Sequence, residues 1–395
     1  MQAIRLFALL TAATTLGCLI VSAQSAERVG GHETSPFQSE SPDVWQMQTS
    51  GTTAGLRGID SVDGTIAWAS GTGGTVLRTV DGGAHWTRCA TPDADKDGAT
   101  LDFRGVQGFN AEAAIVMSSG IGEKSRLYLT LDGCKSWRLL FKNPDAEGFW
   151  DAVRVDSYDN AWAVLGDPVD GRFIVYKSTD HGQTWKSFVK PDRMPRSYSK
   201  GEAVFAASDG SMYLNDREYS LVFVTGGTGR SEVVFTHQFD FFDTGLILYF
   251  RNQSLPIAHG SQSAGAFSFA YRDCLTKIVN MKQTYCPAVV VGGDYQKPEK
   301  RDGTAAYAQF SASLGESKGW HASTTPPHGY RSTVQWSESL KLWITAGTNG
   351  SDISRDDGRT WQPLDNGNWN ALSLPFVVGP TGRIARLQTG YFGPH

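Results

Sequence analysis

The sequence predicts an all-β fold, a single seven-bladed β-propeller of four-stranded blades in which an N-terminal strand completes the last blade. Three observations lead to this prediction. A motif of Ser or Thr, Asp, Gly and Trp occurs four times, short apolar segments separated by glycine-rich turns recur with it, and a strand-like segment without a blade of its own precedes the first repeat. Repeats of a few tens of residues, each with several short strands, are typical of propeller blades.

The repeated motif reads Ser/Thr-x-Asp-x-Gly-x-x-Trp, and its first copy spans Thr79 to Trp86. In the second copy Cys134 replaces the glycine. We expect the aspartate to accept backbone N–H groups in a tight turn, the glycine to supply a positive φ, and the tryptophan to bury its ring beneath the turn. These roles are structural, so we predict neither catalysis nor metal binding for the motif. Its aspartates and tryptophans are Asp81, Trp86, Asp132, Trp137, Asp180, Trp185, Asp356 and Trp361.

The spacing of the motif sets the predicted number of blades. Asp81 and Asp132 are 51 residues apart, Asp132 and Asp180 are 48 apart, and Asp180 and Asp356 are 176 apart, which leaves room for two blades without the motif. Six or eight blades remain open, because residues 230–260 are irregular. The predicted first strands of the seven blades are 56–59, 103–106, 150–153, 201–205, 265–269, 330–334 and 369–372.

The last predicted blade lacks an outer strand, whereas residues 44–49 form a strand without a blade. Pairing the two would close the ring and remove two open sheet edges, which otherwise invite aggregation. We therefore assign residues 44–392 to one propeller and expect a monomer.

The first residues are typical of a secretory signal. One basic residue, Arg5, precedes an apolar run from Leu6 to Val21, and small residues suited to cleavage follow at Ala23 and Ala26. We predict a signal peptide over residues 1–26 and a flexible leader over 27–43, hence a secreted or extracytoplasmic protein. A lipoprotein signal at Cys18 is the weaker alternative, because Thr15 stands where a larger aliphatic residue is usual.

The remaining sequence shows no run of about 18 apolar residues, so we predict no membrane span. The formal net charge of −4 offers no basic footprint for nucleic acid. The sequence also lacks a Walker loop and a Gly-x-Ser-x-Gly elbow, and we predict no cofactor.

Four cysteines remain once Cys18 leaves with the signal, and an exported protein can form disulfides. Cys274 and Cys286 are close in sequence and are the preferred pair. A bond between Cys89 and Cys134 requires two adjacent repeats to meet, and free buried thiols are the alternative there. The spacings do not fit a zinc site, so no metal is predicted.

The first strands of the blades should line the central channel, and a binding site is best sought where they begin. The candidates there are Arg57, Arg104, Asp151, Glu202 and Arg331, joined by Asp294 and Tyr295 after a Gly-Gly turn. Such a polar ring could dock an acidic peptide or a small polar ligand. The alternative is that these charges pair with one another across the channel.

The motif resembles the Asp-box, or bacterial neuraminidase repeat, of sialidases, sortilin-like receptors and photosystem II assembly factors. The stretch from Gly73 to Trp86 is similar to the repeats of the assembly factors. That resemblance implies a non-catalytic exported propeller that binds a protein or peptide partner.

A glycan-active hydrolase of the sialidase kind, or a lectin, is the alternative function, and enzymatic activity is left open. Sialidases carry an Arg-Ile-Pro strand early in the chain. Here Arg383-Ile384 lies in the last predicted blade and is followed by Ala385. The non-enzymatic interpretation is therefore favoured.

Overall fold

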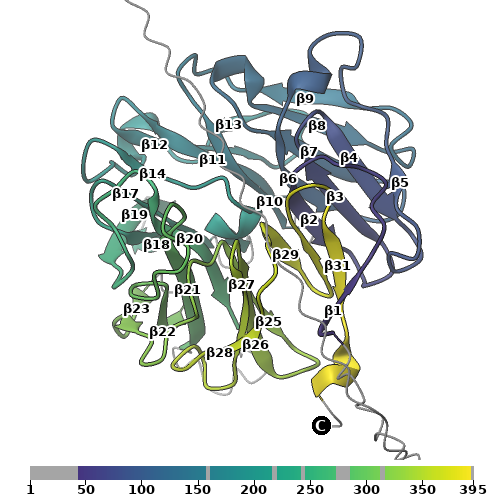
Figure 1. Ribbon diagram of the computed structural model, residues 1–395. Helices are drawn as coiled ribbons and strands as arrows, with labels where there is room; N and C mark the ends of the chain where they lie inside the picture. The colour runs from purple at the N-terminus through teal and green to yellow at the C-terminus, as the bar shows by residue number, and fades with distance from the viewer. Residues whose placement is uncertain are drawn as a thin grey trace, which may run out of the picture. The chain divides into compact units, whose positions relative to one another are not determined.

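The computed structural model describes residues 43–156, 161–215, 220–241, 245–272, 285–311 and 316–392. In these ranges the chain forms antiparallel β-strands joined by turns and short 3-10 helices (Figure 1). The prediction of an all-β propeller with four-stranded blades is confirmed. The predicted signal (residues 1–26), the predicted leader (residues 27–43) except for its last residue, Asp43, and Cys274 lie outside the described residues.

The first three sheets each contain four strands in chain order. The first consists of β2 (Leu56–Ser61), β3 (Ala67–Gly71), β4 (Thr75–Thr79) and β5 (Thr87–Arg88). The second consists of β6 (Phe103–Gly108), β7 (Ala114–Ser118), β8 (Arg126–Thr130) and β9 (Arg138–Lys142). The third consists of β10 (Trp150–Asp156), β11 (Ala161–Val169), β12 (Arg172–Ser178) and β13 (Lys186–Ser187).

The two middle sheets differ in size. One has four strands, β15 (Met212–Asn215), β16 (Ser220–Val224), β18 (Glu232–Phe241) and β19 (Gly245–Ser254). The other is built on β20 (Ala264–Tyr271), β21 (Cys286–Asp294) and β22 (Ala305–Ser311), with β23 (Glu316–Ser317) and β24 (His321–Ala322) at one side and β17 (Gly226–Gly227) and β14 (Glu202–Ala203) at the other.

The expectation that residues 201–205 open the fourth blade is wrong. Only Glu202 and Ala203 form a strand there, and this strand pairs with β17 rather than with β15 or β16. The first strand of that sheet is β15, which pairs with β16. Met212 of β15 and Leu221 and Phe223 of β16 bury their side chains in one core cluster. A short apolar segment looks the same in sequence whether it enters a sheet or fills another buried space.

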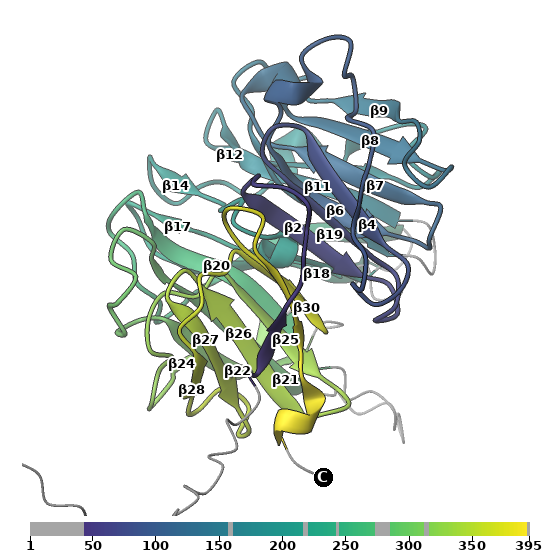
Figure 2. The same cartoon turned by 45° about the vertical axis from the view of Figure 1, so that its right-hand side comes forward.

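The last two sheets bring the ends of the propeller together. One contains β25 (Thr333–Ser337), β26 (Leu342–Gly347), β27 (Gly350–Ser354) and β28 (Gln362–Asp365). The other contains β29 (Ala371–Ser373), β30 (Phe376–Val378), β31 (Ile384–Leu387) and β1 (Trp45–Met47). Strand β1 pairs antiparallel with β31, as predicted, and both views show purple β1 against the yellow C-terminal strands (Figures 1 and 2).

The core lies between the facing surfaces of neighbouring sheets. Between the first two sheets, for example, Trp68 packs with Phe103 and Val116, and all three are fully buried. Burial of such side chains stabilises the fold by about 2 kcal/mol each. The 3-10 helices that connect the strands are η1 (Gly98–Thr100), η2 (Gly122–Lys124), η3 (Pro191–Arg193), η4 (Asp209–Ser211) and η6 (Thr389–Phe392).

The four Asp motifs form the same turn. In each, the Ser or Thr hydroxyl donates to the aspartate Oδ1 at 2.7–2.9 Å and accepts the N–H four positions after it at 2.9–3.0 Å. The aspartate Oδ1 accepts the N–H four positions further on at 2.9–3.1 Å. Of the four tryptophans, Trp361 is buried, whereas Trp86, Trp137 and Trp185 are half-buried. The hydrogen bonds support the structural role predicted for the motif.

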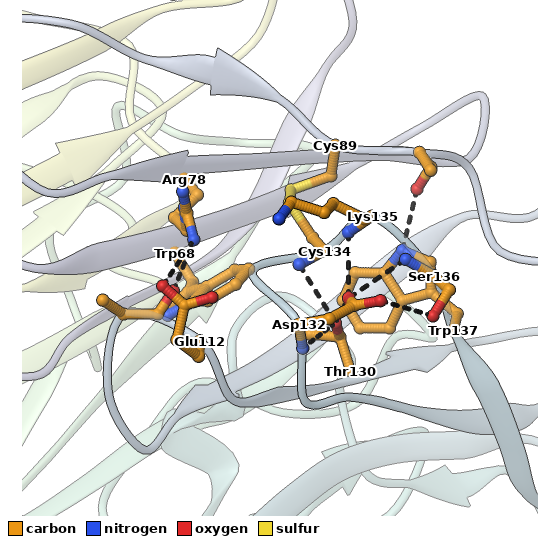
Figure 3. The surroundings of a disulfide bond; sticks show 12 residues. Trp68, Arg78, Cys89, Glu112, Thr130, Asp132, Cys134, Lys135, Ser136 and Trp137 are labelled. Atoms are coloured by element: carbon orange, nitrogen blue, oxygen red, sulfur yellow. Dashed lines mark hydrogen bonds and ion pairs between the residues drawn. A yellow bond between two sulfur atoms is a disulfide. The ribbon is translucent and has the colours of Figure 1, made fainter.

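Cys134 and Cys89 form a disulfide that joins the second copy of the motif to the end of the preceding sheet (Figure 3). Cys134 adopts a φ of 66°, in the left-handed region where the other copies place glycine. The pairing left open by the sequence is thus present. Cys286 is also disulfide-bonded, but Cys274 lies outside the described residues, and the predicted bond between them stays a prediction.

Candidate binding site where the inner strands begin

Strands β2, β6, β10 and β20, in four different sheets, share one irregularity. Their pairing register shifts between Leu56 and Gly58, Phe103 and Gly105, Trp150 and Ala152, and Ala266 and Ser268. A β-bulge of this kind bends the strand and redirects a side chain. The residues inside the four shifts are Arg57, Arg104, Asp151 and Phe267.

These four residues line one cavity of about 510 Å³. Its remaining walls carry aromatic rings and polar groups. They include Phe149, Asp167, Phe205, Gln262, Tyr295, Tyr330, Thr348 and Asn370. Because the lining comes from the beginnings of several inner strands, the cavity lies at one end of the channel that these strands surround.

A second cavity, of about 410 Å³, is lined by residues further along the same strands, among them Asp60, Gln107 and Arg154. Residues 203–210 separate the two cavities, since 203–207 line the first and 208–210 the second. We call residues 203–210 the crossing segment.

Hydrogen bonds hold the crossing segment to several sheets. Asp209 accepts the N–H of Val106 at 3.0 Å and that of Val153 at 3.1 Å. Val204 donates its N–H to Asp167 at 3.0 Å. Burial raises the pKa of Asp209 to about 6 despite these bonds. The segment therefore forms a fixed floor for the first cavity.

Two guanidinium groups share one carboxylate at this site. Arg104 Nε donates to Asp102 at 2.8 Å, and Arg57 Nε lies 3.9 Å from the other oxygen of Asp102. The Arg57 side chain is 35% exposed, and burial lowers its pKa. One carboxylate cannot satisfy all the N–H donors of two guanidinium groups, so donors remain for an anionic or carbonyl group of a ligand.

The same cavity also contains two acidic side chains. Asp151 and Asp167 both line it, and burial raises the pKa of each, to about 6 for Asp167 and well above the usual range for Asp151. The proximity of Asp167 contributes to the shift of Asp151. Like charges in a dry site disfavour ionisation of both groups.

Four of the seven residues predicted to surround the channel mouth meet in this cavity, namely Arg57, Arg104, Asp151 and Tyr295. The other three, Glu202, Asp294 and Arg331, are buried outside its lining. Their placement differs from the expectation because the bulge that turns Arg57 into the channel has no counterpart at these positions.

The three displaced residues make local contacts instead. Glu202 accepts the Thr225 hydroxyl at 2.7 Å. Asp294 accepts the N–H of Gln296 at 3.1 Å and lies 3.5 Å from the Lys297 ammonium. Arg331, whose side chain is fully buried, donates to Asp352 at 2.7 Å. These contacts hold the surrounding loops.

Several residues of the cavity were not predicted from the sequence. Phe267 occupies the position equivalent to Arg57 and Arg104, so alignment of the inner strands could have found it. No such signal marks Asp167 or Phe205. Asp167 lies on β11, the second strand of its sheet, and Phe205 lies in the crossing segment, so an alignment of the inner strands includes neither residue.

Neither a metal site nor a membrane-spanning helix is present in the described residues. In these ranges no group of three or more His, Cys, Asp or Glu side chains is placed to hold a metal ion. No helix there has the length and apolar character needed to cross a membrane.

Comparison with known proteins gives a consistent picture. Residues 37–220 match the family model described as photosynthesis system II assembly factor YCF48. A curated relative, the photosystem II assembly lipoprotein Ycf48 of Synechococcus sp. (strain CC9902), is 25% identical over 185 residues, which are 45% of this chain and 50% of the relative. The chain resembles the photosystem II assembly factors. The match spans about half the length of the curated relative.

Solved structures extend the likeness of this assembly-factor-like propeller to most of the chain. A structure titled YCF48 bound to D1 peptide has a TM-score of 0.57 at 16% identity and covers 88% of this chain and 97% of its own. YCF48 from Cyanidioschyzon merolae has a TM-score of 0.56 at 17% identity and covers 87% of this chain and 99% of its own. At identities of 16% and 17%, this likeness shows the fold alone.

Proposed function

We propose that this chain is a non-catalytic propeller that binds a segment of a partner protein in the cavity at the mouth of the channel. The observation that carries the proposal is the pair Arg57 and Arg104, which share Asp102 beside an open cavity of about 510 Å³. Guanidinium groups recognise carboxylates and backbone carbonyls through directed hydrogen bonds. The likeness to the structure of YCF48 bound to D1 peptide supports a peptide as ligand.

The wider context of the proposal rests on sequence and topology together. We infer seven blades, one for each sheet, with the closing blade completed by β1. We infer export to an extracytoplasmic compartment, supported by the signal-like sequence before Ala26 and by the likeness to a photosystem II assembly lipoprotein. The protein would act as a monomer.

A glycan-active hydrolase is the less favoured candidate. A sialidase holds a substrate carboxylate with a cluster of arginines, but Arg331, a candidate from the sequence, is fully buried and bound to Asp352. The two arginines of the cavity, Arg57 and Arg104, can bind and orient a ligand without taking part in a reaction.

Site-specific cross-linking in extracts of the source cells tests the proposed function. Tyr295 lines the cavity and is 45% exposed, so benzoylphenylalanine at this position should cross-link to one defined partner. The same group at Tyr391, which is 43% exposed at the C-terminal end, serves as the matched control and should not capture that partner.

Charge reversal identifies the groups that bind. The double variant Arg57→Glu/Arg104→Glu should lose the cross-link, whereas Arg88→Glu/Arg138→Glu, on exposed outer strands, should retain it. Equal capture by both double variants would exclude the cavity as the binding site. Turnover of a fluorogenic glycoside that disappears in Asp167→Asn would overturn the non-catalytic proposal.

A further inference from the structure

We propose that the acidic side of the cavity is a subsite for a cationic side chain, a lysine or arginine of the bound segment, seated between Asp151, Asp167 and the aromatic wall. This inference rests on the proposed function, since it specifies which residue the bound segment places in the cavity. An acidic ligand held by the two arginines would not fill this subsite. The bound segment must carry a basic group as well as an acidic one.

Asp151 supplies the observation that points to a missing donor. The residue is only 2% exposed and lines the cavity, and its Oδ2 has no hydrogen-bond partner among the described residues. A buried carboxylate oxygen without a donor is costly, and buried polar groups are normally paired. An ammonium or guanidinium group that enters the cavity would satisfy this oxygen.

Asp167 strengthens the preference for a cation. It lines the same cavity, and one of its oxygens accepts the N–H of Val204. Two acids at one site repel each other when both are charged, and a bound cation removes that repulsion. A neutral donor would satisfy the Asp151 oxygen but leave the repulsion in place.

The aromatic wall completes the subsite. Phe205 and Phe267 are stacked with ring centroids 4.0 Å apart, and Tyr330 meets Phe267 edge-on at 4.8 Å. Tyr295 lies 6.4 Å from Tyr330. Aromatic rings attract cations and pack against the methylene groups of lysine and arginine. The cavity volume is within the range that takes a small ligand or one long side chain.

The two arginines of the cavity restrict which residues can flank the basic residue in the bound segment. Arg57 and Arg104 lie in the same cavity, so a segment with basic residues alone would be repelled. Arg104 also faces Asp151 closely enough to oppose the rise of its pKa. The fitting ligand therefore carries a basic residue next to an acidic group or a chain carboxylate.

Cation binding must depend on pH. Asp151 is faced by Arg104 and Asp167. The other ionisable groups that line the cavity are Arg57, Tyr295 and Tyr330. Because burial raises the pKa of both acids, a cation binds with release of a proton. Affinity for the cation should therefore rise with pH through the range near 6.

Synthetic peptides test the subsite with the full exported chain. The probes are acetyl-Glu-Gly-Xaa-Gly-amide peptides, where Xaa is lysine or arginine, or the uncharged norleucine or citrulline of similar shape. Isothermal titration should show the lysine peptide binding at least about tenfold more tightly than the norleucine peptide, as expected for a desolvated charge pair. Raising the pH from 5 to 7.5 should tighten binding of the lysine peptide and leave the norleucine peptide unchanged.

Variants assign the effect to this cavity. Asp151→Asn should reduce the preference for lysine over norleucine to less than about twofold. Asp167→Asn should weaken it too, and gives a second measurement if Asp151→Asn does not fold. Asp60→Asn changes a buried acid of the other cavity and should keep the full preference.

The outcomes separate this inference from the proposed function. Equal binding of the lysine and norleucine peptides would overturn the cationic subsite while leaving the partner-binding site in place. A preference for lysine that survives in both Asp151→Asn and Asp167→Asn would also overturn it. Absence of a cross-linked partner at Tyr295 in the otherwise unchanged protein would instead overturn the proposed function itself.

Discussion

At the scale of single residues, aspartates illustrate how position decides chemistry. In the Asp motifs, hydrogen bonds from the residue four positions later lower the pKa of Asp81, Asp132 and Asp180 to about 2. In the channel, burial raises the pKa of Asp167 and Asp209 to about 6. The first group is fixed as an anion within its turn, whereas the second can exchange a proton near neutral pH.

The motif aspartates should contribute to stability in a defined range of pH. Their pKa in the folded protein is below the unfolded value of 3.8, so the stability they provide is complete above about pH 4 and is lost as the pH falls toward 2. Asp132→Asn removes one such group. Urea unfolding at pH 5, 4, 3 and 2.5 should therefore show a shallower loss of stability with acid for this variant than for the unchanged protein. The exposed Asp95→Asn serves as control, and an identical slope for both variants would contradict the prediction.

At the scale of elements, the inner strands show how far the sequence allows prediction. The recurrence of the short segments Leu56 to Ile59 and Phe103 to Val106 with the repeats identified the strands, and their equivalent positions in the repeat placed Arg57 and Arg104 at the channel. The bulge that contains each of these arginines became visible only in the structure.

The crossing segment could not be predicted in the same way. Its apolar residues, such as Val204 and Phe205, suit a strand equally well. Their actual position depends on contacts with distant residues, above all Asp209 with Val106 and Val153. The local sequence pattern carries no information about contacts between distant residues. Asp167 and Phe205 could therefore be assigned to the cavity only from the structure.

The disulfide of the second Asp motif gives a prediction at the same scale. Cys134 holds a positive φ of 66°, which costs a non-glycine residue about 1–2 kcal/mol. Its bond to Cys89 closes a loop of 45 residues and should add about 4 kcal/mol in the chain-entropy model. We expect Cys89→Ala/Cys134→Ala to lose most of this stability and Cys89→Ala/Cys134→Gly to lose about 1 kcal/mol less. Chemical denaturation of both double variants measures the difference, and equal stability would show that the turn does not select glycine.

At the scale of the whole propeller, stability depends on joining the two ends of the chain. Trp45 on β1 is buried, packs against Trp369 at 6.1 Å, and donates its indole N–H to Ser351 at 3.0 Å. Strand β1 also pairs with β31, whose other neighbour is β30. One short strand therefore links the first described residues to two sheets from the end of the chain, and its loss affects both packing and the sheet edge.

Comparing removal of β1 with Trp45→Ala should separate the effect of core packing from the effect of the paired sheet edge. A chain that begins at residue 50 loses Trp45 and exposes the edge of β31, so it should be destabilised by roughly 3–5 kcal/mol and should associate as its concentration rises. A chain that begins at residue 43 keeps β1 and should behave as the unshortened chain. Trp45→Ala removes the buried ring but keeps the backbone pairing, so it should lose stability without gaining association. Urea unfolding and size-exclusion chromatography over a range of concentrations distinguish the three. Association of Trp45→Ala to the same degree as the shortened chain would mean that the indole ring, rather than the paired edge, keeps the propeller closed.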